Sequence, residues 1–512
     1  MKKSILKSTI VVLACSVAAK ILSYIWEASL AAYLGASDEA DCFYMMLGIF
    51  NILYPVLDLG IWKVFMPIYK TKLARNLTSD AEKIANISIA FFFSLSLLLI
   101  VTLIAFAGPL TILIAPGFSA EKKLITAKYI RIASPLYLTM AVSSVVGAVL
   151  QSHEKFFGSQ LREIGAHVSK IACLWICYRY FGIYAAVIAY IIGSVCRVLV
   201  QLPFIDWKWN FRIDLRFRDA DVMTMMKGLP SVAITSAVTN LNGLIDKRFA
   251  SDALSGSVAC LNYGHKLMNV FSGTISTAIG TATYPTMIQY IAEGEEEKLK
   301  SLIGNIIGVL AFIIVPISLF CMSFSKELVT IAFQRGAFDA SATELTAAVF
   351  LCYCIGMLFT GVTTVVSNVF YGYGDTKTTM WISLANVLIN ILLNLILIRV
   401  MGVAGLALAT SISTAVSLAI RLICLKKLIR LDYGTILKET LKILAISLAA
   451  VGMAWLIFKR LLSLSILMSL LGSVFVIALC GIGLAKLLHV KAFQFFRELL
   501  RSRFRRNRAS HE

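Results

Sequence analysis

Charged residues are scarce in this chain of 512 residues: Asp, Glu, Lys and Arg make up 15%, whereas hydrophobic residues make up 59%. A soluble domain carries roughly a quarter of charged residues, so this composition indicates a membrane protein that crosses the bilayer many times. The hydrophobic runs are long and rich in Leu, Ile and Val. They do not alternate in segments of about ten residues, so transmembrane helices explain them better than a transmembrane barrel does.

Signatures of metal sites and of nucleotide hydrolysis are missing as well. The 11 cysteines lie almost entirely inside apolar segments, where small buried thiols are common. Two pairs of cysteines lie close together in the sequence, Cys173 with Cys177 and Cys352 with Cys354. Neither pair has further His or Cys residues nearby. They do not form a metal-binding pattern, and no Walker-type phosphate loop occurs. We therefore expect no cofactor, no metal and no enzymatic activity.

Apolar runs of about 20 residues predict about fourteen transmembrane helices. We place them at residues 8–34, 41–69, 84–106, 124–151, 156–181, 184–204, 222–249, 258–291, 302–324, 343–371, 378–400, 403–425, 436–458 and 464–488. With the N-terminus in the cytoplasm, 31 of the 48 Lys and Arg residues lie in the cytoplasmic segments or in the helix ends next to them. The positive-inside rule therefore places both termini in the cytoplasm.

The net charge of +20 is concentrated in loops and at the C-terminal end. A basic stretch with interleaved aromatic residues at 206–221 is typical of an interfacial segment on anionic lipid headgroups. The tail at 491–512 has five arginines between residues 501 and 508 and is predicted to be cytoplasmic. Nucleic-acid binding by this tail is the alternative, but the charge distribution favours membrane lipids as partners and no nucleic acid.

The chain contains a weak internal repeat. Residues 151–186 align with residues 371–406, and in both stretches a glycine, Gly182 or Gly402, links two predicted helices. Further matched pairs earlier in the chain are Cys42 with Cys260 and Pro67 with Pro285. Chance similarity between apolar segments is the alternative, but it does not explain the shared spacing of glycine and proline. Each repeat holds six predicted helices, and this even number makes the two repeats parallel.

The predicted fold is therefore all-α, with two six-helix lobes around a central cavity and two additional C-terminal helices. The expected parts are an N-lobe at 1–205 (helices 1–6), the basic linker at 206–221, a C-lobe at 222–430 (helices 7–12), helices 13–14 at 431–490 and the tail at 491–512. Two facing lobes predict rocking between inward-open and outward-open states.

Ionisable residues inside apolar segments mark a candidate site. Lys20 and Glu27 lie seven residues apart, which places them on one helix face. Asp41 opens the second predicted helix, and Asp58 and Lys63 lie deeper within it. Charges at membrane depth cost several kcal/mol unless they meet a wet cavity or a partner. A substrate pathway and internal ion pairs that only fix helix packing both remain open from these residues alone.

Several short motifs, in this order and spacing, resemble the MurJ/MviN lipid II flippase family of the multidrug/oligosaccharidyl-lipid/polysaccharide exporter superfamily. The resemblance covers most of residues 8–430. The motifs are Gly35-Ala36-Ser37 with Asp41, Asp246 to Ser251, Gly256-Ser257-Val258, Gly280-Thr281 with Pro285, Phe333 to Phe338, and Phe370-Tyr371 with Gly374 to Thr378. The resemblance implies fourteen helices in a bacterial cytoplasmic membrane. It also implies a flippase that translocates an undecaprenyl-diphosphate-linked peptidoglycan precursor by alternating access, with peptidoglycan or polysaccharide synthesis enzymes as partners.

The family resemblance also implies a cavity in which several arginines hold the substrate diphosphate. By position, Lys20 and Lys266 replace two of these arginines, while Trp26 and Tyr54 occupy two more. The predicted substrate-binding residues are Lys20, Asp41, Lys266, Glu27 and Lys63. We expect Asp41 and Glu27 to pair with the lysines until cargo exchanges these carboxylates for phosphates. The less cationic cavity leaves a second lipid-linked oligosaccharide, for a surface polysaccharide, as an alternative cargo.

A coupling cation is a separate expectation. Asn390 and Asn394 lie four residues apart on one helix face, and Thr410 and Asp246 would complete an oxygen cage for Na⁺. The resemblance implies such a site in some members of the family. Hydrogen bonds that hold helices together explain the two asparagines equally well. The sequence therefore leaves Na⁺, H⁺ and the membrane potential open as energy sources.

Two other classes compete with a lipid-linked-glycan flippase. A multidrug or cation antiporter of the same superfamily would use one membrane-embedded carboxylate in an apolar cavity, not a pair of lysines. A membrane enzyme such as a glycan polymerase or ligase would need large extracytoplasmic loops, and the loops here are short. The two additional C-terminal helices favour the flippase, since they could build a groove for a lipid tail.

Overall fold

The computed structural model describes residues 2–205, 212, 214–459, 465–488, 490–491 and 493–494. This described part contains nineteen α-helices, one π-helical turn and one 3₁₀ turn. Contacts divide the chain into two compact units, Met1–Ala259 with Arg335–Asp339 and Cys260–Gln334 with Ala340–Glu512. The expected all-helical, multi-span membrane fold is confirmed.

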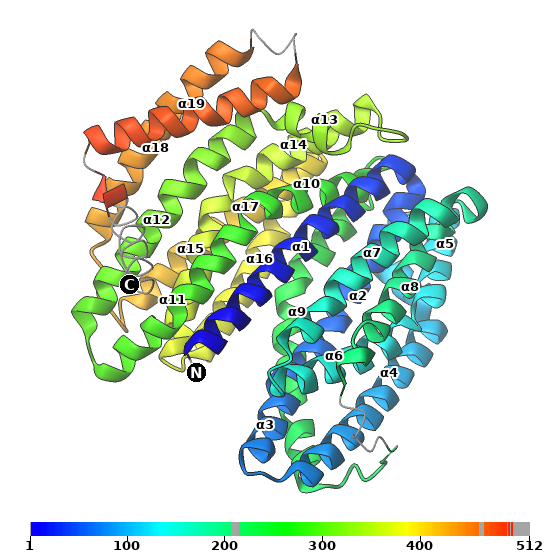
Figure 1. Cartoon of the computed structure of the whole chain (residues 1–512). Coiled ribbons are helices and arrows are strands. Elements are labelled where there is room, and N and C mark those ends of the chain that lie inside the picture. Colours follow the sequence, from blue (N-terminus) through cyan, green and yellow to red (C-terminus); the bar gives the residue numbers. More distant parts are fainter. Residues whose placement is uncertain are drawn as a thin grey trace. The chain divides into compact units, whose positions relative to one another are not determined.

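The first unit is built on α1 and α2. Its elements are α1 (Lys2–Leu34), α2 (Asp38–Gly60), the π-helical η1 (Ile61–Phe65), α3 (Met66–Ala74), α4 (Thr78–Ile114), α5 (Ala120–Ala133), α6 (Leu136–Ser152), α7 (Phe156–Phe181), α8 (Tyr184–Leu199), the 3₁₀ turn η2 (Leu202–Phe204) and α9 (Ala220–Ala250). The side chain of Ser37 accepts a hydrogen bond from the Ala40 amide and so caps α2. Helix α1 packs against α7, α7 against α8, and α9 against α2 and α4 (Figure 1).

The second unit contains the remaining helices and most of α10. They are α10 (Ser257–Phe271), α11 (Gly273–Glu293), α12 (Glu296–Ser323), α13 (Ser325–Phe333), α14 (Ala340–Ile355), α15 (Met357–Gly372), α16 (Thr376–Met401), α17 (Val403–Leu425), α18 (Tyr433–Lys459) and α19 (Ile466–Leu487). Helix α18 packs against α12 and against α19 (Figure 1). Ala311 and Val315 of α12, Ile443 and Ile446 of α18, and Ala485 of α19 form a shared apolar core.

The glycine links of the sequence repeat have the same geometry in both units. Gly182 adopts φ 51° and ψ −132°, and Gly402 adopts φ 57° and ψ −140°. Their amides donate to the carbonyls of Tyr178 and Ile398, at 2.8 and 3.0 Å. The helices before them, α7 and α16, are both 26 residues long. Positive φ is accessible to glycine without a steric cost, so the same residue ends both helices.

A matched cysteine and a matched bend repeat in the same way. The Cys42 thiol donates to the Lys122 carbonyl, and the Cys260 thiol donates to the Ala342 carbonyl. The chain bends by 41° between α5 and α6, and by 43° between α14 and α15. Pro135 lies at the first bend, and Gly356 at the second. These equivalences support the repeat that the sequence indicates.

Fewer than fourteen helices of the described residues meet the length and composition of a membrane span. In the described residues, eight helices are long and apolar enough to cross a membrane, or ten if each bent pair is one span. Three predicted single helices are broken in two, at 124–151, 258–291 and 343–371. Helix α7 is long enough but carries Arg162, Glu163 and Lys170, and it is not among the eight. Embedded polar residues explain why α7 is not counted, and backbone breaks explain why the three divided helices are not counted as single helices.

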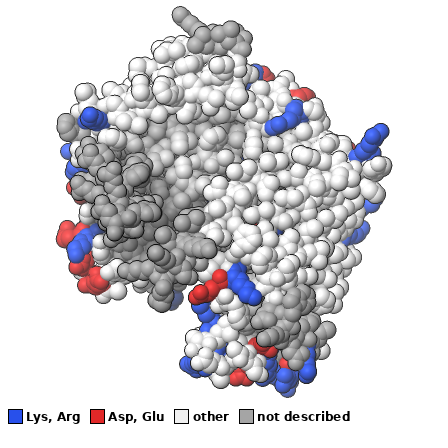
Figure 2. Space-filling model, viewed as in Figure 1, with Lys and Arg blue, Asp and Glu red and all other residues white. Residues whose placement is uncertain are grey.

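The compact units also divide the chain at a different place from the predicted lobes. Helix α9 was expected to open the C-lobe, but it packs against α2 and α4 and belongs to the first unit. Residues 206–211 and 213 of the basic linker and nearly all of the basic tail lie outside the described residues. On the face shown in Figure 2, many of the visible Lys, Arg, Asp and Glu side chains lie near the edges of the view, and one group of both signs lies in its lower middle.

Candidate substrate and cation sites

Lys20 and Glu27 share α1 but have different surroundings. Lys20 is exposed, whereas Glu27 is 5% exposed and accepts a hydrogen bond of 2.8 Å from the Tyr44 hydroxyl of α2. A buried carboxylate needs such a donor, because it has lost its hydration shell. Glu27 is therefore held by the packing of α1 against its neighbours, and Lys20 presents its side chain at the surface of the first unit.

The two other lysines of the predicted substrate site are also exposed. Lys63 lies on the π-helical turn η1, and Lys266 lies on α10 of the second unit beside the exposed His265. A π-helical turn inside a longer helix is frequent at functional sites, because it shifts the register of the side chains that follow. Each compact unit thus has an exposed lysine on a mostly apolar helix.

Asp41 is almost completely buried, at 1% exposed, and its carboxylate has three partners. It accepts hydrogen bonds from the amides of Gly256 and Ala259, both at 2.9 Å, and pairs with Lys122 at 2.9 Å. A carboxylate at a helix N-terminus satisfies free amides and interacts favourably with the helix dipole. Asp41 thereby fixes the start of α10. The expected pairing of Asp41 with a cavity lysine is not present here, since Lys122 of α5 takes that place.

Three glycines of the family-like motifs meet in the same region. Gly35, Gly256 and Gly336 all have positive φ. A Cβ atom on Gly336 would clash with the backbone oxygen of Ala32, and one on Gly256 would clash with that of Ala36. The Ala337 amide donates to the Ala32 oxygen at 2.8 Å, so the loop at 335–339 caps the end of α1.

Asp58 belongs to a partly buried polar network that the sequence did not reveal. Its carboxylate accepts hydrogen bonds from the Ser144 hydroxyl at 2.5 Å and from the Trp62 indole at 3.3 Å, and it pairs with Arg162 at 3.3 Å. Arg162 also lies 3.5 Å from Glu163. The lone charges in α2 and α7 were visible, but their pairing across about a hundred residues was not. This network joins α2, α6 and α7 and has the form of an ion pair that fixes helix packing.

Trp26 and Tyr54 lie where the family resemblance leads us to expect arginines. Each of these two aromatic side chains is contacted by a cation from a neighbouring helix. Arg197 of α8 donates to the Tyr54 hydroxyl at 2.8 Å and pairs with Glu163 at 2.8 Å. The Lys170 ammonium lies 5.2 Å from the centre of the Trp26 ring, within the range of a cation–π interaction. Positive charge is therefore present beside both aromatic rings, although the rings themselves carry none.

Three of the four predicted cation-binding residues lie together in the second unit. Asn390 and Asn394 of α16 are fully buried, and the Asn394 amide donates to the Asn390 oxygen at 3.1 Å. The Asn390 amide in turn donates to the Thr410 hydroxyl of α17 at 3.2 Å. The fourth residue, Asp246, is 3% exposed and lies in α9 of the first unit. The predicted shared face of the two asparagines is confirmed.

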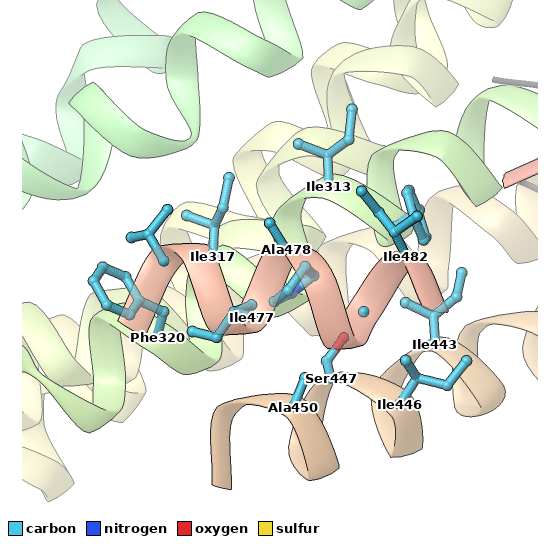
Figure 3. A pocket seen from close by; sticks show the side chains of 14 residues that line it. Ile313, Ile317, Phe320, Ile443, Ile446, Ser447, Ala450, Ile477, Ala478 and Ile482 are labelled. Carbon is cyan, nitrogen blue, oxygen red and sulfur yellow. The ribbon is translucent and has the colours of Figure 1, made fainter. Parts of the chain in front are cut away.

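An apolar pocket of about 290 Å³ lies among three helices of the second unit (Figure 3). Helices α12, α18 and α19 supply its walls, and one side chain among them, that of Ser447, is polar. The lining residues are Phe312, Ile313, Pro316, Ile317, Phe320, Ile443, Ile446, Ser447, Ala450, Val474, Ile477, Ala478, Gly481 and Ile482. Such a pocket suits a hydrocarbon chain better than a polar headgroup.

Known proteins resemble this chain over most of its length. A family profile described as "Lipid II flippase MurJ" matches residues 30–476. The probable lipid II flippase MurJ of Buchnera aphidicola subsp. Baizongia pistaciae is 25% identical over 425 residues, which cover 80% of this chain and 81% of that protein. The probable lipid II flippase MurJ of Borreliella burgdorferi is 26% identical over 453 residues, covering 85% and 86%.

Solved structures share the fold. A lipid II flippase MurJ in an inward closed conformation has a TM-score of 0.78 at 19% identity and covers 94% of this chain and 99% of that one. A multidrug resistance MATE family transporter of the MOP superfamily, in an inward-facing conformation, has a TM-score of 0.65 at 16% identity, covering 78% and 92%. The profile spans far more than half of the chain and confirms the resemblance seen in the motifs. This chain belongs to the lipid II flippase MurJ family.

Proposed function

We propose that the chain is a flippase that carries lipid II, an undecaprenyl-diphosphate-linked peptidoglycan precursor, across the bacterial cytoplasmic membrane by alternating access. The observation that carries this proposal is the family match over residues 30–476. Curated relatives named as probable lipid II flippases cover four fifths or more of the chain at about 25% identity. Membership in a flippase family agrees with the expectation of a transporter and not an enzyme.

The diphosphate of the cargo requires cations. An unpaired anion in a low-dielectric environment is prohibitively costly, and lysine binds phosphate as a point charge. Lys20 and Lys266 are exposed on mostly apolar helices, one in each unit, and Lys63 adds a third exposed lysine. In this proposal the negative charge of Glu27 balances the positive charge of Lys20, which lies on the same helix. Asp41 acts indirectly, because it fixes the start of α10, the helix that carries Lys266.

The isoprenoid tail of the cargo requires an apolar path. We assign the pocket among α12, α18 and α19 to this tail, because its lining is almost entirely hydrocarbon (Figure 3). Methylene groups gain about 0.8 kcal/mol each when they leave water, so a long tail does not leave an apolar environment readily. The two C-terminal helices would then serve the lipid tail while the lysines serve the headgroup.

The finer architecture expected from the sequence is part of this proposal. It comprises fourteen spans, two parallel six-helix lobes and cytoplasmic termini. Broken elements such as α10 with α11 each count as one span in this view. Enzymes of peptidoglycan or polysaccharide synthesis are the expected partners on either side, because they must supply and consume the lipid-linked glycan.

We further propose that a monovalent cation is coupled to transport. Asn390, Asn394 and Thr410 provide amide and hydroxyl oxygens in a cluster of the second unit. Asp246, the fourth residue predicted from the sequence, is a buried carboxylate of the first unit. Oxygen ligands suit Na⁺. Transport measured with and without a sodium gradient, and with the membrane potential collapsed, distinguishes Na⁺, H⁺ and the potential as drivers.

Another lipid-linked oligosaccharide is the second candidate cargo. Trp26 and Tyr54 stand where arginine is common in the family, and the cations beside them come from α7 and α8. A headgroup with a different charge or size would suit this change. The multidrug or cation antiporter, the third candidate, rests only on a shared fold with a MATE transporter.

Complementation tests the main proposal. A strain depleted of its own lipid II flippase, and given this chain, is expected to grow and to restore lipid II translocation. A variant with Lys20→Ala and Lys266→Ala serves as the matched negative control at equal protein level. Failure of the wild-type chain, despite normal amounts in the membrane, would favour the surface-polysaccharide cargo instead.

A further inference from the structure

Lys170 is a buried cation in α7 for which the proposed transport cycle has no role. Its side chain is 7% exposed, and its ammonium lies 4.6 Å from the Tyr190 ring centre and 5.2 Å from that of Trp26. The two rings contact each other edge to face at 5.9 Å. Removing an ammonium from water is costly, and the ring faces offset part of this cost. The fold therefore maintains a positive charge at this point.

The sequence repeat gives this position an equivalent in the second unit. Helices α7 and α16 begin and end 220 positions apart, at Phe156–Phe181 and Thr376–Met401. The same shift relates Lys170 to Asn390 and Tyr190 to Thr410. In the second unit the Asn390 amide donates to the Thr410 hydroxyl at 3.2 Å. The same two positions thus contact each other in both units, with different chemistry.

A neighbouring residue changes together with this pair. Gly193 of α8 lies so close to the Lys170 stem that a Cβ atom there would clash with its Cγ atom. The equivalent residue in the second unit is Ser413, which is fully buried. Glycine therefore makes room for the lysine in the first unit, whereas the shorter Asn390 leaves space for a serine in the second. The two positions differ in a coordinated way.

The Lys170 position of the first unit and the Asn390–Thr410 pair of the second unit differ in how they can hold a positive charge. Amide and hydroxyl oxygens, as on Asn390 and Thr410, are ligands for a hard monovalent cation but carry no charge of their own. The Lys170 ammonium brings the charge with it and needs no bound ion.

We propose that Lys170 is a built-in cation, whose ammonium fills in the first unit the place that an exchangeable monovalent cation fills beside Asn390 and Thr410 in the second. This inference rests on the cation site proposed above. One repeat then has a permanent charge and the other an exchangeable one, so that binding or release of the ion alters one unit and leaves the other unchanged.

The test asks whether a free cation can replace the ammonium. The purified full chain is unfolded thermally in NaCl and in choline chloride at equal ionic strength. Asn390→Ala is expected to abolish any sodium response of the wild type. In that background, Lys170→Asn supplies an amide oxygen and is expected to give a sodium-dependent rise in Tm of about 2 °C. Lys170→Met, which is similar in length but has no oxygen, is the matched control and is expected to show no such rise.

Each outcome decides the inference. A Lys170→Asn variant that can be purified in NaCl but not in choline chloride supports it, as does the expected rise in Tm. If Lys170→Asn in the Asn390→Ala background responds to sodium no more than Lys170→Met does, the inference is overturned. A variant that can be purified in neither salt also overturns it, because a free cation then does not replace the ammonium. If the Tm of the wild type does not depend on sodium but that of Lys170→Asn does, the role of Lys170 as a built-in cation is supported. The proposed cation site at Asn390 is then wrong.

Discussion

At the scale of single residues, charges within apolar helices serve two different purposes. Asp41 and Asp58 are enclosed by partners, with Lys122 at 2.9 Å from the first and Arg162 at 3.3 Å from the second. Lys20 and Lys266 are exposed on their helices. Enclosed pairs fix how helices pack, whereas we propose that the exposed lysines contact the diphosphate of the cargo. Burial, which the sequence does not contain, separates the two groups.

The exposed lysines are expected to be needed for transport. Lys20→Ala or Lys266→Ala removes a cation that we propose to contact the diphosphate, and each change should lower the transport rate at least about tenfold, equivalent to about 1.4 kcal/mol. Arginine at either position should preserve function, because it keeps the charge. Lys377→Ala is the control, since Lys377 is exposed at the start of α16 and its loss leaves the proposed site intact. Normal transport in both alanine variants would contradict the assignment.

Asp41 is expected to contribute more to stability than its neighbour Asp38. Asp41→Asn leaves Lys122 with a weaker partner in a buried place and should cost about 3 kcal/mol. Asp38 also pairs with Lys122, at 2.8 Å, but its side chain is 51% exposed, so Asp38→Asn should cost less than about 1 kcal/mol. Thermal unfolding of the purified variants in detergent measures both. Equal losses of stability would show that burial does not set the difference.

At the scale of elements, glycines decide how helices end and how loops approach them. Gly336 and Gly374 both have positive φ, but a Cβ atom on Gly336 would clash with Ala32, and one on Gly374 meets nothing within 4 Å. Gly374→Ala should therefore cost only the backbone strain, about 1 kcal/mol. Gly336→Ala should cost distinctly more, because the loop at 335–339 must move from the end of α1. Equal shifts in Tm would rule out the close approach as the cause.

Helices α18 and α19 allow a direct test of the proposed tail pocket. Ala478 lines this pocket, so Ala478→Trp places an indole in a volume of about 290 Å³. Transport should fall at least about tenfold if the pocket holds the isoprenoid tail. Leu479→Trp adds an indole one residue further along α19, at a side chain that is 64% exposed, and should leave transport intact. The same loss in both variants would point to a general effect on α19.

At the scale of the whole molecule, the repeat and the charge bias together define a topology. A fluorescent reporter that folds only in the cytoplasm is expected to light up when it is fused after Gly294, which lies between α11 and α12. The same reporter fused after Gly402, between α16 and α17, should stay dark. The positive-inside rule is the physical basis, since lysine and arginine are retained on the cytoplasmic side. The reverse pattern would invert the proposed orientation.

Much of the fold is readable from hydropathy, because long apolar runs in a membrane have to be helical. The breaks are harder to read. Pro135 gives a local signal for the bend between α5 and α6, but Gly356 does not by itself predict a bend. A Cβ atom added at Gly356 would lie 2.7 Å from the Ser411 hydroxyl, so Gly356 lies close to a residue 55 positions further along the chain. Such contacts depend on tertiary packing, and local sequence patterns cannot reveal them.

The candidate site is divided in the same way. The sequence indicated Lys20, Lys266 and the pair Asn390 and Asn394 as candidates, because a charged or amide side chain in an apolar helix is costly. Their roles stay predictions. It did not identify Lys122, which lies 81 residues from its partner Asp41.

By itself, the sequence determined the class of molecule, the helical repeat and the ionisable residues that needed an explanation. Composition and spacing are enough for these, since the bilayer restricts the backbone to few solutions. Only the tertiary structure decided which charges are enclosed and which are exposed, because that depends on partners far away in the chain. The buried ammonium of Lys170, beside Tyr190 and Trp26, is of this second kind.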